Sequence, residues 1–417
     1  MENFIINGPS KLRGRVEISG SKNEALKLIP LAISLKNKVR VSNVPRINDI
    51  FSQLEIFQIL GGKAVFGKNL MLDATRIDKY STVCKPSRNL RASIVYLGPL
   101  LSRFKKVQFP FPGGCAIGSR SISTHLEAFR DLGASIKERS DTVCVSLERV
   151  SSEKIKLREK SVSATENVFL YLASTDNDVV VENCAIEPEI MHLADILRAG
   201  GAKIDALSER AFRIKGSACL GIEEIEVMPD RIEAGTFLIA FAATGGAGEI
   251  FPFQAKYLET PLRILKSCGV KFECADNKCT VFESSSLKSF EIVTSPYPGF
   301  PTDLQSPMAL IASRSAGTSV LREEMFENRL NYLDILSKMG LKYKLVNKHE
   351  AQIIGPSDLN SAEVVSPDLR AGITILVAAT MAKGRSVIKG AEVIDRGYEN
   401  IEEKLSKLGA NITRSDG

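Results

Sequence analysis

A short pattern recurs six times along this 417-residue chain. Each copy places a glycine after an amphipathic stretch and just before a β-prone run, as in Leu408-Gly409-Ala410-Asn411-Ile412. The glycines lie 72, 68, 68, 71 and 69 residues apart, at Gly61, Gly133, Gly201, Gly269, Gly340 and Gly409. Self-similarity at a fixed period is the signature of a repeat architecture. The pattern predicts that each glycine follows a helix end in the left-handed conformation.

The residues before each glycine complete one repeat. An apolar helix is expected at positions such as 232–243 or 371–381, and a β-prone run follows, as at 179–181 or 386–388. A second, amphipathic helix then leads to the glycine. Because the first helix is apolar nearly all round, we expect it to be buried. The sequence therefore predicts an α/β (α+β) fold of two domains, each made of three strand–helix–strand–helix–strand repeats with buried helices and outer sheets.

Composition narrows the possible functions. The chain is 44% hydrophobic and 25% charged, as in ordinary globular proteins. It has no apolar run long enough to span a membrane and no signal-peptide pattern at its start, so we expect a cytoplasmic protein. Three histidines and eight cysteines without a CxxC pair argue against a metal site. The net charge of +6 is dispersed and aromatic residues are only 6%, which disfavours nucleic acids and favours a small anionic ligand.

The predicted buried helices all begin with polar or charged residues. These starts are Lys22-Asn23-Glu24, Arg91-Ala92-Ser93, Thr165-Glu166-Asn167, Asp230-Arg231, Thr302-Asp303 and Asp368-Leu369-Arg370. Ordinary helix capping explains an aspartate or threonine here. A lysine or arginine opposes the helix dipole unless an anion binds. The basic starts therefore predict anion sites at helix N-termini.

One loop has an unusual composition. Residues 111–120 contain three glycines and a proline around Cys115, which predicts an exposed loop. Arg120 follows five residues later and would lower the pKa of the thiol. A glycine-rich turn with an incidental cysteine is the alternative. No Gly-Lys-Ser/Thr follows, so a phosphate-binding P-loop is not supported.

Three further segments carry candidate charges. Asp303 stands near a helix start, where it is either an N-cap or a general base. Arg329 and Arg396 follow the strands of their repeats, in the position that the Cys115 loop occupies in its own repeat. Glu187-Pro188-Glu189 has the corresponding place in the third repeat and lacks glycosidase spacing. Equivalent positions in a repeat predict that these residues converge on one cleft.

These segments, in this order, resemble the UDP-N-acetylglucosamine 1-carboxyvinyltransferases, a family of enolpyruvyl transferases. The resemblance runs from residue 18 to residue 399. Its motifs are Ser21-Lys22-Asn23, Leu90-Arg91-Ala92-Ser93, Pro112-Gly113-Gly114-Cys115, Pro229-Asp230-Arg231-Ile232-Glu233, Phe300-Pro301-Thr302-Asp303, Phe326-Glu327-Asn328-Arg329, Asp368-Leu369-Arg370 and Asp395-Arg396-Gly397-Tyr398-Glu399. It implies two inside-out α/β domains, formed by residues 22–228 and by residues 1–21 with 229–417, with the active site in the cleft between them.

The resemblance also implies a reaction. The enolpyruvyl group of phosphoenolpyruvate passes to the 3′-hydroxyl of UDP-N-acetylglucosamine through a tetrahedral ketal, and phosphate is released. This is the first committed step of peptidoglycan precursor synthesis, and the family is the target of the epoxide antibiotic fosfomycin. No metal, organic cofactor, nucleic acid, membrane or obligate protein partner is implied. The family closes its cleft over substrate and excludes water from the intermediate.

Residue roles follow from the same resemblance. Cys115 matches the proton donor, Asp303 the proposed base, and Lys22, Asn23 and Arg396 complete the catalytic set. The substrate-binding positions are Lys22, Asn23, Arg91, Arg120, Ser121, Ile122, Ser123, Thr124, His125, Lys160, Ser161, Val162, Ser163, Arg231, Thr302, Asp303, Met325, Phe326, Arg329, Asp368, Leu369, Arg370 and Arg396.

Two departures and two alternatives stand beside this interpretation. Ser121 replaces the family's usual proline, and Ser163 its usual glycine, which would cost about 1 kcal/mol if that backbone needs a positive φ. The shikimate-pathway enolpyruvyl transferase shares the fold and phosphoenolpyruvate, but the Gly-Gly-Cys loop and the Asp-Arg-Gly-Tyr-Glu segment argue against it. A non-catalytic sensor of nucleotide sugars is disfavoured because Cys115, Lys22, Asp303 and Arg396 occur together.

Overall fold

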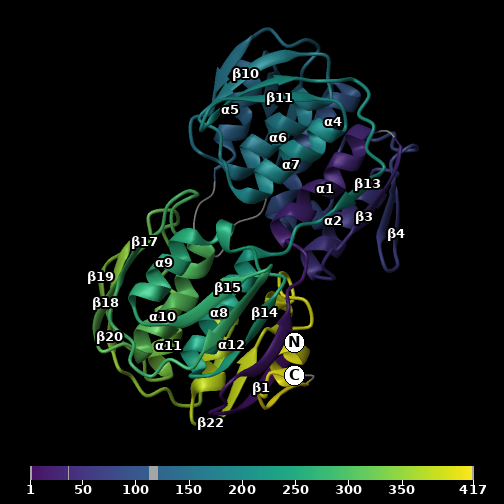
Figure 1. The fold of residues 1–417 in the computed structure, drawn as a ribbon. Helices are drawn as coiled ribbons and strands as arrows, with labels where there is room; N and C mark the ends of the chain where they lie inside the picture. Colours follow the sequence, from purple (N-terminus) through teal and green to yellow (C-terminus); the bar gives the residue numbers. More distant parts are fainter. Residues whose placement is uncertain (1, 36, 112–120, 416–417) are drawn as a thin grey trace. The chain divides into compact units, whose positions relative to one another are not determined.

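The computed structural model describes residues 2–35, 37–111 and 121–415 of the chain. Its described residues fall into two compact units. The first unit comprises residues 20–111 and 121–228, and the second unit comprises residues 2–19 and 229–415. Figure 1 shows both units as helices enclosed by sheets. The chain therefore leaves the second unit after its first two strands and returns to it after residue 228.

The first unit holds repeats one to three. Its buried helices are α1 (Lys22–Leu35), α4 (Leu97–Phe104), which continues the 3₁₀ turn η1 (Arg91–Tyr96), and α6 (Val162–Ala173). The outer helices are α2 (Asn48–Ile59), α3 (Lys85–Asn89), α5 (Ser123–Asp131) and α7 (Pro188–Ala199). The sheets, in spatial order, are β13 (Glu224–Glu226), β3 (Lys38–Ser42), β5 (Leu70–Asp73) and β4 (Lys63–Phe66); β6 (Lys106–Pro110), β8 (Thr142–Ser146) and β7 (Ser135–Glu138); and β11 (Lys203–Ser208), β12 (Ala211–Lys215), β10 (Asp178–Glu182) and β9 (Lys154–Lys156).

The second unit holds repeats four to six. Its buried helices are α8 (Arg231–Thr244), α10 (Gln305–Arg314), which continues the turn η3 (Thr302–Leu304), and α12 (Leu369–Met381). The outer helices are α9 (Glu259–Ser267), α11 (Tyr332–Lys338) and α14 (Ile401–Lys407), with the short η2 (Ala255–Tyr257) and α13 (Ala391–Ile394). The sheets are β15 (Lys271–Ala275), β16 (Lys278–Phe282), β14 (Ala247–Phe251) and β2 (Arg13–Glu17); β17 (Glu291–Val293), β18 (Gly317–Arg322), β20 (Glu350–Gly355) and β19 (Lys342–Asn347); and β21 (Glu363–Val365), β22 (Gly384–Lys389), β1 (Asn3–Gly8) and β23 (Ile412–Ser415). The predicted arrangement of buried helices and outer sheets is confirmed.

Within the described ranges, no helix is long and apolar enough to cross a membrane.

Strands from distant parts of the chain complete the sheets. Strand β13, from the end of the first unit, pairs in parallel with β3 of the first repeat. Strand β2 does the same for β14 of the fourth repeat, and β1 lies antiparallel between β22 and β23 of the sixth. In the second repeat the parallel strand is reduced to one bridge between Ser81 and Gln108. The N-terminal strands thus close the second unit although about 200 residues separate them from it in sequence.

The six repeat glycines end the outer helices in the same way. Their φ angles lie between 94° and 111°. Each glycine N–H donates to the carbonyl three residues back, and the next N–H donates to the carbonyl five residues back, as in Gly201 to Arg198 and Ala202 to Leu197. This is the Schellman motif, which satisfies the last free carbonyls of a helix. The glycine prediction is confirmed in all six repeats.

Alanine substitutions at two of these glycines distinguish the cost of a left-handed backbone from the cost of a steric clash. A Cβ on Gly201 would meet nothing within 4 Å, whereas one on Gly340 would lie 2.6 Å from the Asp358 carbonyl oxygen. Gly201→Ala is therefore expected to lower the free energy of unfolding by about 1 kcal/mol, through the left-handed φ alone. Gly340→Ala adds the clash and should cost about 3 kcal/mol. Urea titrations of both variants measure the difference, and equal losses would contradict it.

Candidate active site

In the second unit, Asp303 lies between two buried guanidinium groups. Its Oδ1 accepts a hydrogen bond from Arg329 at 2.8 Å, and its Oδ2 accepts one from Arg370 at 3.0 Å. The side chains of Arg329 and Arg370 are 5% and 6% exposed, against 27% for Asp303. Asp303 caps no helix, because Pro301 occupies the N-cap of η3 and Leu304 that of α10. The N-cap interpretation of Asp303 is therefore wrong, and its half-buried carboxylate is the most accessible member of this charge cluster.

Arg370 joins two further core helices to this cluster. It is the second residue of α12, where Asp368 caps the helix by accepting from the Arg370 N–H at 2.9 Å. Its Nη1 donates to the hydroxyl of Tyr398 at 3.2 Å, and that hydroxyl lies 3.0 Å from Thr236 Oγ1 of α8. Burial opposes the charge on Arg370, but the combined interactions with Asp303, Tyr398 and Asp230 outweigh burial and raise the pKa of the guanidinium above its usual range. The starts of α8, η3 and α12 are thus linked by side-chain contacts.

The segment that carries Met325 and Phe326 is held by Glu323, which the sequence analysis missed. One carboxylate oxygen of this fully buried glutamate accepts from the N–H groups of Met325 and Phe326, at 2.9 and 3.1 Å. The other accepts from the Thr302 hydroxyl at 2.8 Å. Leaving a buried carboxylate without partners is costly, so these bonds fix the segment. The sequence signal that could have identified Glu323 is its position directly after strand β18, since Arg329 was selected because it follows the same strand.

Arg231 and Arg396 complete the predicted charges of the second unit. Arg231 begins α8 directly after its N-cap Asp230, is 8% exposed and has its guanidinium 5.6 Å from the Tyr297 ring centroid. Arg396 lies half-buried between α13 and α14. Leu369 is the half-buried first residue of α12. Asp230 and Asp368 thus cap α8 and α12, and Arg231 and Arg370 lie in the first turns of these helices, whereas η3 begins without a side-chain cap.

In the first unit, the first turn of α1 is braced by ion pairs. Lys22 Nζ lies 2.8 Å from Asp49 Oδ2, and their side chains are 11% and 8% exposed. Lys27, one turn on, donates to the Asn23 carbonyl oxygen at 2.5 Å and lies 3.2 Å from Glu166 on α6. Asp49 neutralises a cation that would otherwise oppose the helix dipole. These contacts give Lys22 and Asn23 a defined orientation.

Glu166 makes the stability of the first unit depend on pH. Burial, which outweighs the nearby Lys27, raises its pKa from 4.5 to about 7. Between these values the unfolded chain loses this proton while the folded chain keeps it, so stability falls as pH rises from about 4.5 to about 7. The expected loss is about 3 kcal/mol. Urea titrations across this window should show a shallower slope for Glu166→Gln, and an unchanged slope would contradict the assignment.

The segments predicted for the nucleotide sugar meet around His125. Asn167 Nδ2 lies 2.9 Å from His125 Nδ1, and Asn167 Oδ1 accepts from the Gly98 N–H, which fixes the amide orientation. His125 therefore accepts at Nδ1 and donates from Nε2 to Ser163 Oγ at 3.0 Å. Arg91 donates to the Ser121 carbonyl at 2.9 Å. The remaining predicted positions here are the buried Ile122 and Thr124, the half-buried Ser123, Ser161 and Val162, and the exposed Lys160.

One sequence-based expectation in this region is wrong, and the condition attached to Ser163 is not met. Helix α6 begins at Val162 rather than at Thr165, because the Ser161 hydroxyl accepts from the Ala164 N–H and caps it there. Thr165 instead bonds the Ser161 carbonyl at 2.8 Å from inside the helix. Ser163 consequently has a helical backbone and is absent from the positive-φ residues. Its replacement of a glycine carries no strain.

Cys115 and Arg120 lie outside the described residues, so the structure leaves their predicted roles untested.

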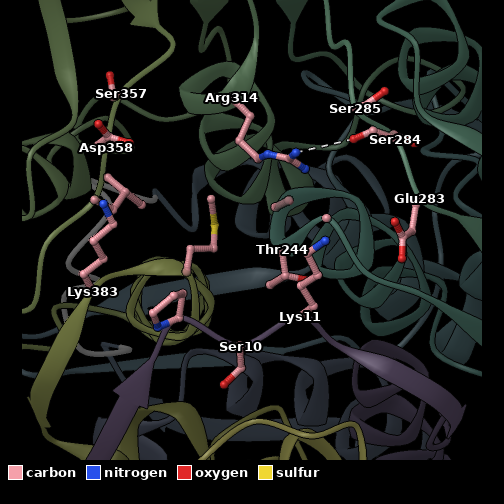
Figure 2. Close-up of a pocket in the computed structure, with 15 residues that line it drawn as sticks. Ser10, Lys11, Thr244, Glu283, Ser284, Ser285, Arg314, Ser357, Asp358 and Lys383 are labelled. Atoms are coloured by element: carbon pink, nitrogen blue, oxygen red, sulfur yellow. Dashed lines mark hydrogen bonds between the residues drawn. The ribbon is translucent and has the colours of Figure 1, made fainter.

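A cavity of about 560 Å³ lies in the second unit, away from Asp303. Thr244, Arg314 and Met381 line it, at the C-terminal ends of α8, α10 and α12. Figure 2 shows Arg314 among Ser284, Lys11 and Lys383 there. Asp303 and Arg370 belong to the opposite ends of these helices, so volume alone does not locate the charged site.

Solved structures share this architecture. The enolpyruvyl transferase NikO from Streptomyces tendae matches with a TM-score of 0.90 at 21% identity, over 100% of this chain and 99% of that one. The EPSP synthase from Acinetobacter baumannii matches with a TM-score of 0.73 at 17% identity, with both chains fully covered. At these identities the likeness establishes the fold, which is that of the enolpyruvyl transferases.

Sequence comparisons define the family. The sequence model of EPSP synthase (3-phosphoshikimate 1-carboxyvinyltransferase) matches residues 6–405. UDP-N-acetylglucosamine 1-carboxyvinyltransferase from Pelagibacter ubique (strain HTCC1062) is 38% identical over 416 residues, covering 99% of this chain and 100% of the relative. The enzyme of that name from Campylobacter jejuni (strain RM1221) is 39% identical over 416 residues, with 98% of each covered. The chain belongs to the enolpyruvyl transferase family, among the UDP-N-acetylglucosamine 1-carboxyvinyltransferases. The predicted resemblance is confirmed, and the chain is a transferase.

Proposed function

We propose that this enzyme transfers the enolpyruvyl group of phosphoenolpyruvate to the 3′-hydroxyl of UDP-N-acetylglucosamine, releases phosphate and so begins peptidoglycan precursor synthesis. The observation that carries the proposal is the Asp303 carboxylate held between two nearly buried arginines. Phosphoenolpyruvate has about three negative charges, which suit bidentate guanidinium groups. The names of the full-length relatives support UDP-N-acetylglucosamine as the acceptor and a carboxyvinyl group as the group transferred.

The chemistry divides into addition and elimination. The oxygen of the sugar 3′-hydroxyl attacks C2 of phosphoenolpyruvate while Asp303 accepts the hydroxyl proton. Cys115 delivers a proton to C3. The resulting tetrahedral ketal loses a proton from C3, and phosphate departs. Lys22, Arg120 and Arg396, with the two arginines beside Asp303, neutralise the carboxylate and phosphate charges. Asn23 orients the intermediate.

The nucleotide sugar is assigned to the His125 region of the first unit. Arg91, residues 121–125 and residues 160–163 bind it, while Arg231, Thr302 and residues 325–326 of the second unit complete the pocket. We infer that residues 22–228 and residues 1–21 with 229–417 form two domains of a cytoplasmic enzyme that needs no metal or organic cofactor. The contacts around His125 and around Asp303 support each half of this assignment separately.

Phosphate release tests the proposal. The wild-type protein should release phosphate from phosphoenolpyruvate with UDP-N-acetylglucosamine and not with shikimate 3-phosphate. Cys115→Ser should lose most of this activity, and fosfomycin should inactivate the wild type by alkylating Cys115. Release with shikimate 3-phosphate would instead assign the shikimate-pathway reaction. Binding of the nucleotide sugar without any phosphate release would make the protein a sensor.

A further inference from the structure

Two cysteines face each other across a tight hairpin of the second unit. Strands β15 and β16 are joined by Asp276 and Asn277, whose φ angles of 50° and 62° are typical of a two-residue type I′ turn. Ala275 pairs with Lys278 beside the turn, and Cys274 pairs with Cys279 at the next position. In such a hairpin this next pair is not hydrogen-bonded through the backbone, so its Cα atoms approach to about 4.5 Å. That separation lies within the range of disulfide-bonded cysteines.

The two sulfur atoms are already in close contact. Cys274 Sγ and Cys279 Sγ are 2.7 Å apart. Non-bonded carbon atoms rest at about 3.5–4.0 Å, and a disulfide bond is about 2.05 Å long. The register that the turn imposes therefore brings the thiols close to bonding distance. Closing a bond between them requires little backbone movement.

A small oxidant can reach one member of the pair. A hollow of about 320 Å³ is lined by Cys274 together with Gln254, Lys256 and Lys278. Cys274 is half-buried, whereas Cys279 is fully buried behind it. The hydrogen bond between the two thiols lowers the pKa of Cys274 and, together with burial, raises the pKa of Cys279. Cys274 is thus placed to react first, with Cys279 placed to resolve the product.

The other buried thiols of the described chain provide a comparison. Cys184 and Cys268 have carbonyl oxygens near their sulfur atoms, of Val181 at 3.5 Å and Leu265 at 3.2 Å. Burial raises their pKa values to about 12 and about 11. They combine poor access with low thiolate content, which disfavours oxidation. The hairpin pair differs in having both an entry route and a partner thiol.

We propose that Cys274 and Cys279 form a redox-active dithiol that a peroxide converts into a cross-strand disulfide. The Cys274 thiolate attacks one peroxide oxygen, which becomes bonded to sulfur as a sulfenic acid while the other oxygen leaves as water after protonation. Cys279 then attacks the sulfenic sulfur, its proton leaves with the hydroxyl group as a second water, and the S–S bond forms. The peroxide gains the two electrons that the two thiols lose, and a thiol such as dithiothreitol reverses the change. The bond fixes β15, the edge strand of its sheet, to β16.

Tryptic mapping tests this site directly, because Lys278 separates the two cysteines. Trypsin places Cys274 in peptide 272–278 and Cys279 in peptide 279–288, so only a disulfide joins them. The folded protein is treated with a small excess of hydrogen peroxide, alkylated after unfolding and digested without reductant. We expect a linked peptide pair that dithiothreitol splits. Cys115 falls in the separate peptide 107–120, so its own oxidation leaves this result unchanged.

Matched variants make the outcome decisive. Cys279→Ser should trap Cys274 as a sulfenic acid that dimedone labels, whereas Cys274→Ser should leave Cys279 fully alkylatable. Cys184 and Cys268 should be recovered as alkylated thiols in every sample. Recovery of both hairpin cysteines as separate peptides after peroxide treatment would overturn the proposal. This readout requires no turnover, so it stands or falls independently of the enolpyruvyl transfer.

Discussion

Asp303→Asn is expected to lower kcat by about 10³-fold while phosphoenolpyruvate binds more tightly. The variant keeps the shape of the side chain but removes the base that accepts the sugar proton. It also frees Arg329 and Arg370 from the carboxylate that neutralises them at 2.8 and 3.0 Å. Two nearly buried guanidinium groups then gain an anionic ligand as their best partner. A lower kcat together with a lower dissociation constant for phosphoenolpyruvate would identify Asp303 as a base.

Its matched control is Asp178→Asn. Asp178 also accepts from two nitrogens of one arginine, Arg213, at 2.8 and 3.0 Å, but this pair is exposed on strands β10 and β12. Exposed pairs contribute about 0–1 kcal/mol, so kcat and substrate affinity should stay at wild-type values. Isothermal titration and steady-state phosphate release measure both quantities. Weaker phosphoenolpyruvate binding by Asp303→Asn would show that the carboxylate orders the arginines, and would remove it as the base.

The fold was predictable because its determinants are local and repeated. The same sequence pattern, an amphipathic helix followed by a glycine with a positive φ, occurs six times, and the apolar helix in each repeat has to be buried. The spacing of the repeats does not indicate which distant strands complete each sheet. Strand β1 pairs with β22 and β23 across almost the whole chain, and nothing in residues 3–8 alone specifies those partners. Pairing between distant strands is decided by packing rather than by local propensity.

The candidate site was predictable where charge interrupts an apolar pattern. Lys22, Arg231 and Arg370 stand at buried helix starts, as their repeat positions indicated. The start of α6 was misplaced because Ser161 and Thr165 both suit a cap, and only the geometry of the Ala164 N–H selects between them. Glu323 was missed for another reason. Its carboxylate accepts hydrogen bonds from backbone N–H groups and a hydroxyl, and the sequence does not show which buried carboxylates have such partners.

Lys22→Met should reduce kcat/KM for phosphoenolpyruvate by about 10³-fold, because a charged contact with the substrate is lost from a shielded site. The substitution also removes the cation that lies 2.8 Å from Asp49, whose side chain is only 8% exposed. Losing one partner of a buried ion pair costs about 3–5 kcal/mol. Single-variant activity would therefore mix a binding defect with a folding defect.

The double variant Lys22→Met with Asp49→Asn separates the two effects. Removing the carboxylate as well takes away the uncompensated charge, so the free energy of unfolding should return to within about 1 kcal/mol of the wild type. If Lys22 contacts phosphoenolpyruvate, kcat/KM stays low in this stable protein. If Lys22 only pairs with Asp49, activity recovers together with stability. Because both outcomes are read in a folded enzyme, the double variant decides whether the first turn of α1 binds substrate or only anchors the helix.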